Sequence, residues 1–194
     1  IASGKPYVGF SMVDAALDAS KGEGKGNDFL SNIRECDAII HVVRCFDNDD
    51  IVHSMGKVDP VRDIGVIETE LILADLQSAE QQLERNQKKA RSQDKEAIAN
   101  VELLTRLVKH LNENLPASAL EIKDDERARI KTYNLLSFKK VLYACNVSES
   151  DLADPSKNRH VAAVKAHIAK QHGCETVVIC AQVEAELCDL SPQE

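Results

Sequence analysis

The chain has 194 residues, 43% of them hydrophobic, and a formal net charge of −8 at pH 7. This length fits one ordinary domain, or one domain that carries an insertion. An acidic chain is not expected to bind nucleic acid non-specifically over its whole surface, although it can carry a local basic patch. No signal peptide or apolar span of roughly 18 residues occurs, so we expect a cytoplasmic protein with no membrane partner.

The cysteines are spread along the chain without a CxxC pair or a zinc-like spacing with histidine. Most lie in or beside apolar runs, where cysteine behaves as a small hydrophobic residue. We therefore interpret all six as reduced and structural: Cys36, Cys45, Cys145, Cys174, Cys180 and Cys188.

In chain order, a possible strand at 8–13 precedes a glycine-rich loop and a short helix over 27–35. The run 37–46 is nearly continuous in apolar and β-branched residues, which predicts a strand buried on both faces of a parallel sheet. Apolar residues then recur at helical spacing, break at "KKARSQDKE" and resume, which predicts an antiparallel pair of long helices. We expect the stretch "DDERARIKTYN" to be helical as well. Two further strands are expected at 140–147 and 176–180, with an amphipathic helix over 154–172 between them.

Strands that alternate with helices predict an α/β fold with a parallel sheet, interrupted by a helical insertion. We divide the chain into a first α/β part at 1–63, the insertion at 64–132 and a second α/β part at 133–194. The tip of the helical hairpin is basic, and it is either a solvated end or a contact point for RNA or another acidic partner. Its basic residues are Arg85, Lys88, Lys89, Arg91 and Lys95.

In open α/β sheets, ligands bind beyond the carboxyl ends of the strands. The loop after the second buried strand reads Asn146-Val147-Ser148-Glu149, close to the Asn-Lys-x-Asp pattern of GTP-binding proteins. Glu149 replaces the aspartate that accepts two N–H bonds from guanine, and Val147 replaces the lysine that covers the base. Adenine presents a donor beside an acceptor, so these replacements weaken the case for guanine and leave adenine possible.

Three other positions are candidates for a site. Ala181 follows the third strand and is small enough to let a base ring approach backbone N–H groups, although a plain strand-to-helix turn is the alternative. Asp14 follows the first apolar run and is a candidate to hold Mg²⁺ through water. His53 lies in a polar loop rich in aspartate and is a candidate general base or water-positioning group. His41 lies inside an apolar strand, and we interpret it as a packed core residue.

The glycine-rich stretch "DASKGEGKGNDF" does not match the phosphate-binding pattern G-x-x-x-x-G-K-[ST]. None of the Gly-Lys pairs is followed by serine or threonine, so we find no P-loop in these residues.

Several long stretches resemble the YchF-type Obg-like ATPases. They are "SKGEGKGNDFLSNIRECDAIIHVVRCFDNDDIVHSMGKVDPVRDI", "TELILADL", "YNLLSFKKVLYACNVSE" and "EAEL". Members of this family are P-loop proteins of the GTPase class that prefer ATP, bind Mg²⁺ and associate with ribosomes. They carry a helical hairpin within the nucleotide domain and a TGS domain at the C-terminus. The resemblance implies the same G-domain type of fold here, incomplete at its N-terminus.

The resemblance also implies roles for particular residues. Asn146, Val147 and Glu149 would form the adenine-selecting loop, and Ala181 and Gln182 the second base-side loop. His53 would substitute for the catalytic glutamine of Ras-like GTPases, which is an apolar residue in this family. The switch II segment, next to the γ-phosphate, would comprise Lys21, Gly22, Glu23, Gly24, Gly26 and Asn27.

The chain also departs from the family pattern. The opening strand, the P-loop, the first switch and the TGS domain have no counterpart, and the magnesium motif retains Asp14 but lacks its glycine. We therefore expect weak or no ATP hydrolysis from these residues alone. The leading hypothesis is a monomeric ATP-hydrolysing switch that associates with the ribosome. The alternative is a nucleotide-incompetent module that binds the ribosome, RNA or a protein through the hairpin. A GTPase fragment is disfavoured by the base-loop replacements.

Overall fold

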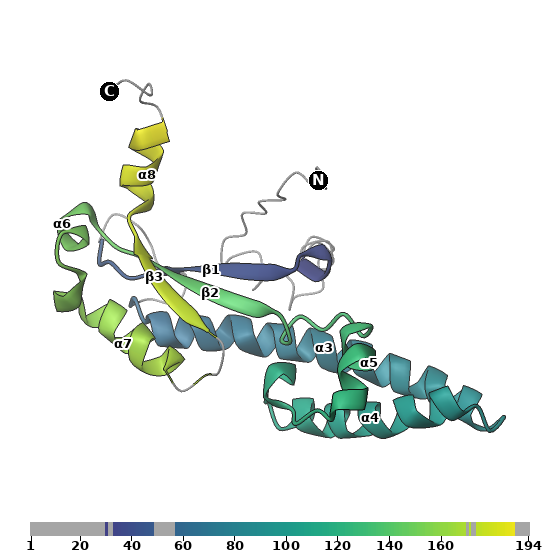
Figure 1. The fold of residues 1–194 in the computed structure, drawn as a ribbon. Coiled ribbons are helices and arrows are strands. Elements are labelled where there is room, and N and C mark those ends of the chain that lie inside the picture. The colour runs from purple at the N-terminus through teal and green to yellow at the C-terminus, as the bar shows by residue number, and fades with distance from the viewer. Residues whose placement is uncertain (1–29, 31–32, 49–56, 170, 172–173, 189–194) are drawn as a thin grey trace. The chain divides into compact units, whose positions relative to one another are not determined.

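The structure is a computed structural model that describes residues 30, 33–48, 57–169, 171 and 174–188 (Figure 1). The chain divides into two compact units. We call the described residues of Ala38–Val66 and Lys140–Glu194 the sheet unit, and those of Ile1–Asp37 and Ile67–Lys139 the helical unit. The strand expected at 8–13 lies outside the described residues. Of the helix expected at 27–35, residues 30 and 33–35 are described, and all four are helical.

The sheet unit contains three parallel strands in the order β1-β2-β3. These are β1 (Ala38–Arg44), β2 (Lys140–Asn146) and β3 (Glu175–Ile179). Their bounds fall within one or two residues of the predicted strands, because each strand coincides with a run of β-branched and apolar residues. The register aligns the last residue of each strand with that of its neighbour, Arg44 with Asn146 and Asn146 with Ile179. The predicted α/β fold with a parallel sheet is confirmed.

The prediction that the first strand is buried on both faces is wrong. Val43 and Cys45 are buried in a core with helix α7 (Arg159–Ile168), but Ile40 is 67% exposed and Val42 is 49% exposed. Successive side chains of a strand point to opposite faces, so a helix packed on one face leaves the alternate residues uncovered. The described helices that pack on the sheet bury the Val43 face, as the position of α7 below the sheet in Figure 1 shows.

Short helices complete the sheet unit. They are α6 (Glu149–Leu152), η3 (Pro155–Lys157) and α8 (Ala181–Cys188). The helix expected over 154–172 is shorter, because η3 occupies its first turn and α7 begins only at Arg159. Sequence reasoning did not find α6.

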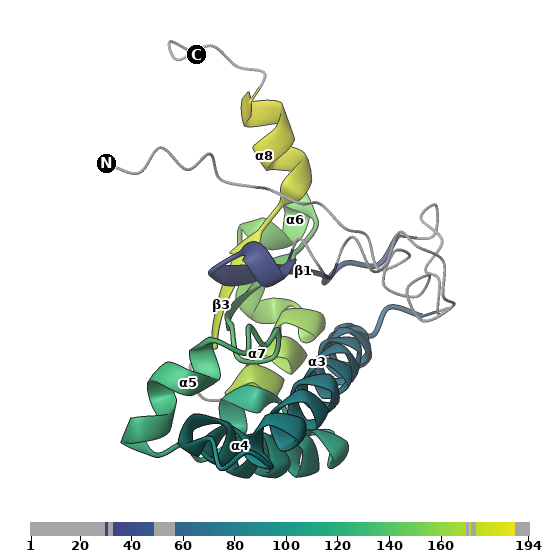
Figure 2. The same cartoon turned by 90° about the vertical axis from the view of Figure 1, so that its right-hand side faces the viewer.

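The helical unit contains the predicted hairpin (Figures 1 and 2). Its helices are α3 (Pro60–Ala90), whose first residues belong to the sheet unit, and α4 (Lys95–Asn112). The polar break is a four-residue turn that ends at Asp94, whose carboxylate caps α4 by accepting from the backbone N–H groups of Glu96 and Ala97. None of the described helices is long and apolar enough to cross a membrane.

Leucines of α4 form the centre of the helical core. Leu103, Leu104, Leu107 and Leu111 recur every three or four residues and are buried with residues of α3. The chain then returns toward β2 through η1 (Ala117–Ala119), η2 (Asp124–Glu126) and α5 (Arg127–Lys131).

A buried carboxylate fastens this returning segment to α3. Asp75 is 0% exposed, and its oxygens accept hydrogen bonds of 2.7 Å each from the backbone N–H of Leu136 and from the backbone N–H and hydroxyl of Ser137. The Arg34 guanidinium lies 3.8 Å away. Burial raises the pKa of Asp75, although these partners oppose the shift. Asp75 therefore positions the residues that lead into β2.

Replacing this carboxylate should destabilise the helical unit. Asp75→Ala leaves one buried and two half-buried donors without their acceptor, so we expect the free energy of unfolding to fall by about 3 kcal/mol. Urea unfolding at pH 7 followed by circular dichroism measures the change. The matched control is Glu80→Ala on the same helix, where the side chain is exposed and the expected change is within about 0.5 kcal/mol. Equal effects of the two substitutions would contradict the anchoring role.

The cysteines of the sheet core are described as free thiols. Cys45, which directly follows β1, and Cys145 of the adjacent strand β2 are both fully buried. The hydrogen bond between the two thiols, together with burial, raises the pKa of Cys45 far above its usual range. The Cys45 side chain is therefore a protonated, unreactive part of the core.

Candidate functional site

The loops that follow the three strands meet at the carboxyl edge of the sheet. Backbone pairing continues one residue past the strands: the N–H of Cys45 donates to the carbonyl of Asn146 at 2.8 Å, and the N–H of Val147 donates to the carbonyl of Ile179 at 2.9 Å. Parallel strands direct all their carboxyl ends to one edge, which is where ligands bind in open α/β sheets. The three loops are thus fixed side by side in the place where the sequence predicts a site.

The side chain of Asn146 joins two of these loops. Its Oδ1 accepts a hydrogen bond of 2.9 Å from the backbone N–H of Ala181. Asn146 ends β2 and Ala181 begins α8, so this bond links the two segments that we predict on either side of a base. The structure therefore brings together residues that lie 35 positions apart in the sequence.

Val147 and Glu149 of the predicted base loop lie in different surroundings. The Val147 side chain is 2% exposed and packs in the sheet core, whereas Glu149 is exposed at the first position of α6. Between them, Ser148 caps α6 and accepts from the N–H of Asp151 at 3.4 Å. The carboxylate of Glu149 is therefore accessible to a ligand, whereas the Val147 side chain fixes the loop by packing in the sheet core.

Gln182 lies on the other predicted base-side segment. Its side chain is exposed and donates from Nε2 to Glu186 Oε1 at 3.1 Å, one turn further along α8. Ala181 is exposed as well. Both residues are accessible at the start of α8, beside the Asn146 side chain that holds this turn.

The loop after β1 is held by an arginine. Arg44 donates from Nε to the carbonyl of Phe46 at 3.2 Å and from Nη2 to the carbonyl of Asn48 at 3.1 Å. Its guanidinium carbon also lies 4.8 Å from the centre of the Phe46 ring, within cation–π range. These contacts order the loop as it leaves the sheet.

Asp47 in the same loop faces the start of α7. Its Oδ2 lies 3.3 Å from His160 Nε2 and 3.0 Å from Arg159 Nη2. The hydrogen bond with His160 is the main reason that the pKa of Asp47 lies below its usual value, and the charges of His160 and Arg159 add to the effect. Asp47 therefore carries a negative charge next to the basic residue that begins α7.

Sequence reasoning did not find Asp151 and Asn158 at this edge, and it named Ser148 only as a member of the base loop. Ser148, Asp151 and Asn158 form a connected hydrogen-bond group in which Asp151 Oδ2 accepts from Ser148 Oγ and from Asn158 Nδ2, both at 2.9 Å. The spacing of Ser148 and Asp151, and the position of Asn158 before a helix, are both N-cap patterns. Those patterns could have located helix starts, but they could not have shown that the two caps contact each other.

The remaining predicted site residues lie outside the described part of the chain. These are Asp14, His53 and the switch II residues Lys21, Gly22, Glu23, Gly24, Gly26 and Asn27. Among the residues that are described, no group of three or more histidine, cysteine or acidic side chains is arranged to hold a metal ion. His41 packs its ring 5.5 Å from that of Tyr143.

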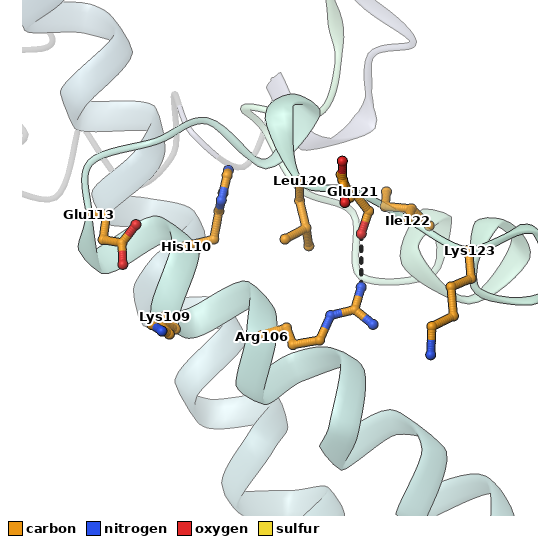
Figure 3. A pocket seen from close by; sticks show the side chains of 8 residues that line it. All are labelled: Arg106, Lys109, His110, Glu113, Leu120, Glu121, Ile122 and Lys123. Atoms are coloured by element: carbon orange, nitrogen blue, oxygen red, sulfur yellow. Dashed lines mark hydrogen bonds between the residues drawn. The ribbon is translucent and has the colours of Figure 1, made fainter.

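A separate groove of about 770 Å³ lies in the helical unit, between α4 and the segment 120–123 (Figure 3). Two of the polar side chains that line it, Arg106 and His110, already have partners. Arg106 donates to the carbonyl of Glu121 and to the carboxylate of Glu126, each at 2.8 Å, and His110 Nε2 lies 3.0 Å from the carbonyl of Pro116. Burial alone would raise the pKa of Glu126, but the bonds from Arg106 and the Lys123 backbone lower it overall. The contacts of Arg106 and His110 therefore fasten the returning segment to α4. The groove includes none of the predicted site residues.

No protein-family model matches the chain. Over 176 residues, or 91% of its length, it is 44% identical to a protein of Bacillus subtilis (strain 168), 46% identical to one of Haemophilus ducreyi and 44% identical to one of Escherichia coli O157:H7. All three are named ribosome-binding ATPase YchF. The chain is homologous to the YchF proteins. It spans about half the length of these relatives, 48% of the first and 47% of the others.

A solved structure agrees with this relation. The structure described as the Schizosaccharomyces pombe YchF GTPase matches with a TM-score of 0.73 and 31% sequence identity, covering 92% of this chain and 50% of that one. The resemblance to the YchF-type Obg-like ATPases is thereby confirmed, and so is the P-loop NTPase-like class of the fold. The YchF relatives are about twice as long as this chain.

The bond between the two base-side loops can be tested directly. Asn146→Ala removes the acceptor for the Ala181 N–H, so hydrogen exchange at that amide should become about fivefold faster, the equivalent of about 1 kcal/mol. Exchange measured by NMR also gives an internal control, because the Val147 amide donates to the Ile179 carbonyl and should keep its rate. An unchanged rate at Ala181 would show that the Asn146 side chain does not hold this turn.

Proposed function

We propose that the chain is the base-recognising part of an ATP-binding, ATP-hydrolysing switch that associates with ribosomes. The observation that carries this proposal is the hydrogen bond from the Ala181 N–H to the Asn146 side chain, since it joins the two predicted base-side loops at the carboxyl edge of the sheet. Homology to proteins named ribosome-binding ATPases supports the same assignment. We extend the ATPase activity and ribosome binding named for these longer relatives to this chain on the basis of that homology.

The preference for adenine is argued from Glu149 and Val147. An exposed carboxylate at the first position of α6 can accept a hydrogen bond from the amino group of adenine. The lysine stem that covers guanine in GTP-binding proteins is replaced by Val147, whose side chain is buried. The bacterial relatives are named ATPases and the fission yeast structure is named a GTPase, so base preference is the feature to measure first.

The catalytic part of the proposal rests on the resemblance. Asp14 is proposed to hold Mg²⁺ through water, residues 21–27 to form switch II, and His53 to position or activate the attacking water. Mg²⁺ supplies charge neutralisation at the β- and γ-phosphates, and the protein contributes positioning. Within the described residues, Asn146 and Glu149 are the groups that would select the base.

The ribosome contact is assigned to the tip of the hairpin within the insertion proposed for 64–132. The five basic side chains of the tip, Arg85, Lys88, Lys89, Arg91 and Lys95, are all exposed around the turn between α3 and α4. Lys88 is paired with Glu84 at 2.7 Å, and both side chains are about two-thirds exposed, so the pair contributes little stability. Exposed cations at the end of a helical hairpin are suited to contact RNA phosphates. This feature would serve the alternative function too, that of a binding module without nucleotide turnover.

Nucleotide titration tests the base assignment. In the full-length gene product with Mg²⁺, we expect calorimetry to detect ATP binding and excess GTP to displace labelled ATP poorly. Glu149→Ala should weaken ATP binding by about tenfold, because it removes a charged acceptor. The matched control is Glu175→Ala, an exposed carboxylate at the amino end of β3. Efficient displacement of ATP by GTP, or no effect of Glu149→Ala, would contradict the adenine assignment.

Ribosome co-sedimentation tests the hairpin. Reversing two charges of the tip, Lys89→Glu with Arg91→Glu, should reduce co-sedimentation and lower the slope of log affinity against log salt by about two. Lys109→Glu, an exposed lysine on α4 away from the turn, serves as the control and should bind like the wild type. Ribosome binding by a wild-type protein that binds no ATP would favour the alternative module. Unchanged binding of the tip variant would place the ribosome contact elsewhere.

A further inference from the structure

Asn158 uses its whole side-chain hydrogen-bonding capacity. It is 8% exposed, and its Oδ1 accepts from the backbone N–H groups of His160 and Val161 at 2.9 and 3.0 Å. Its Nδ2 donates to the carbonyl of Cys45 at 2.8 Å and to Asp151 Oδ2 at 2.9 Å. A side-chain amide offers two donor hydrogens and two acceptor lone pairs, and all four are satisfied within the sheet unit.

The accepting half of Asn158 has a purely local role. By accepting two N–H groups in the first turn of α7, Oδ1 caps that helix. Aspartate and serine cap helices about as well as asparagine does, through a side-chain oxygen alone. Helix capping therefore accounts for an oxygen at this position but not for an amide nitrogen.

The donating half of Asn158 connects two of the loops of the carboxyl edge. One Nδ2 hydrogen binds the Cys45 carbonyl, at the end of β1, 113 positions earlier in the sequence. The other binds Asp151 in α6, directly after the predicted base loop. Only a residue with two donors and an acceptor can cap α7 and hold both of these segments at once.

Asp151 connects Asn158 to the base loop through a shared carboxylate oxygen. The same Oδ2 that accepts from Asn158 also accepts from the hydroxyl of Ser148 at 2.9 Å, and the Asp151 N–H donates to the Ser148 carbonyl at 3.1 Å. Ser148 lies between Val147, whose side chain is in the core, and Glu149, which is exposed. The position of Glu149 is therefore set on one side by the packing of Val147 and on the other by the Asn158–Asp151–Ser148 chain.

We propose that Asn158 is a positioning residue that holds the base loop 146–149 against the end of β1 and thereby sets nucleotide affinity and base selectivity. The inference rests on the proposed function for its nucleotide readout. It goes beyond that function because Asn158 lies outside the loops that contact the base and acts on them through Asp151 and Ser148.

The test exchanges the hydrogen-bond donor and acceptor between positions 158 and 151. Asn158→Asp keeps the oxygen that caps α7 but places a second carboxylate against Asp151 and leaves the Cys45 carbonyl without its donor. In the full-length gene product we expect ATP affinity to fall by about tenfold and the ratio of ATP to GTP affinity to fall with it. Adding Asp151→Asn supplies a donor for the contact between residues 158 and 151 but not for the Cys45 carbonyl, so the double variant should recover part of the lost affinity.

Two further measurements separate positioning from simple destabilisation. Hydrogen exchange at the amides of Asp151 and Leu152, which both donate to the Ser148 carbonyl, should become faster in Asn158→Asp and return toward the wild-type rate in the double variant. The matched control is Asp94→Asn, which alters the cap of α4 in the helical unit and should leave nucleotide affinity unchanged. If Asn158→Asp fails to fold, Asp151→Ala carries the same test, since it removes the shared acceptor while leaving the α7 cap intact.

The outcomes separate the inference from the function on which it rests. A wild-type protein that binds no ATP refutes the proposed function and, with it, the nucleotide role of Asn158. A wild-type protein that binds ATP, together with a folded Asn158→Asp variant of unchanged affinity and selectivity, refutes the inference alone. A loss of affinity in Asn158→Asp without faster hydrogen exchange at the Asp151 and Leu152 amides shows that Asn158 does not act through the base loop, and it overturns the positioning role.

Discussion

Because the three strands run parallel and end in register, the segments that follow them are held at one edge of the sheet. Backbone pairing extends past the strands, from Cys45 to Asn146 and from Val147 to Ile179. Side chains add the next connections, with Asn146 bonded to Ala181 and Asn158 bonded to Cys45. Each of these contacts depends on strand register, since a shift by one residue would turn the alternate side chains to the other face. The candidate site is thus a consequence of how the strands pair.

The elements of the fold were predictable where a local pattern decides them. Runs of β-branched residues located the three strands, and helical spacing of leucines located the hairpin. The exposure of Ile40 and Val42 was not predictable, because apolar residues on both faces of a strand say nothing about which face receives a helix. The late start of α7 was also missed, since η3 takes up the first turn of the amphipathic pattern.

In the candidate site too, local sequence patterns identify some residues, whereas only contacts between distant segments identify others. Asn146 and Glu149 could be proposed from sequence because they stand at fixed spacing after an apolar run. Asn158 could not, because its significance comes from contacts with Cys45 and Asp151 that no spacing rule describes. Residues that bind a ligand directly tend to form short motifs, whereas residues that position them are identified by the hydrogen bonds they satisfy. The burial of Val147 is a further example, since a motif places that residue beside the base but does not say that its side chain enters the core.

Helix α3 is the one described helix that belongs to both units. Ile64 near its start is fully buried in the sheet core, and Asp75 further along anchors the helical unit. Gly65 lies next to the division between the units, and a Cβ built there would meet no atom within 4 Å. Glycine costs a helix interior about 1 kcal/mol relative to alanine. Apart from Pro60 at its first position, the intrinsic helix propensity of α3 is therefore lowest at Gly65, beside the division between the units.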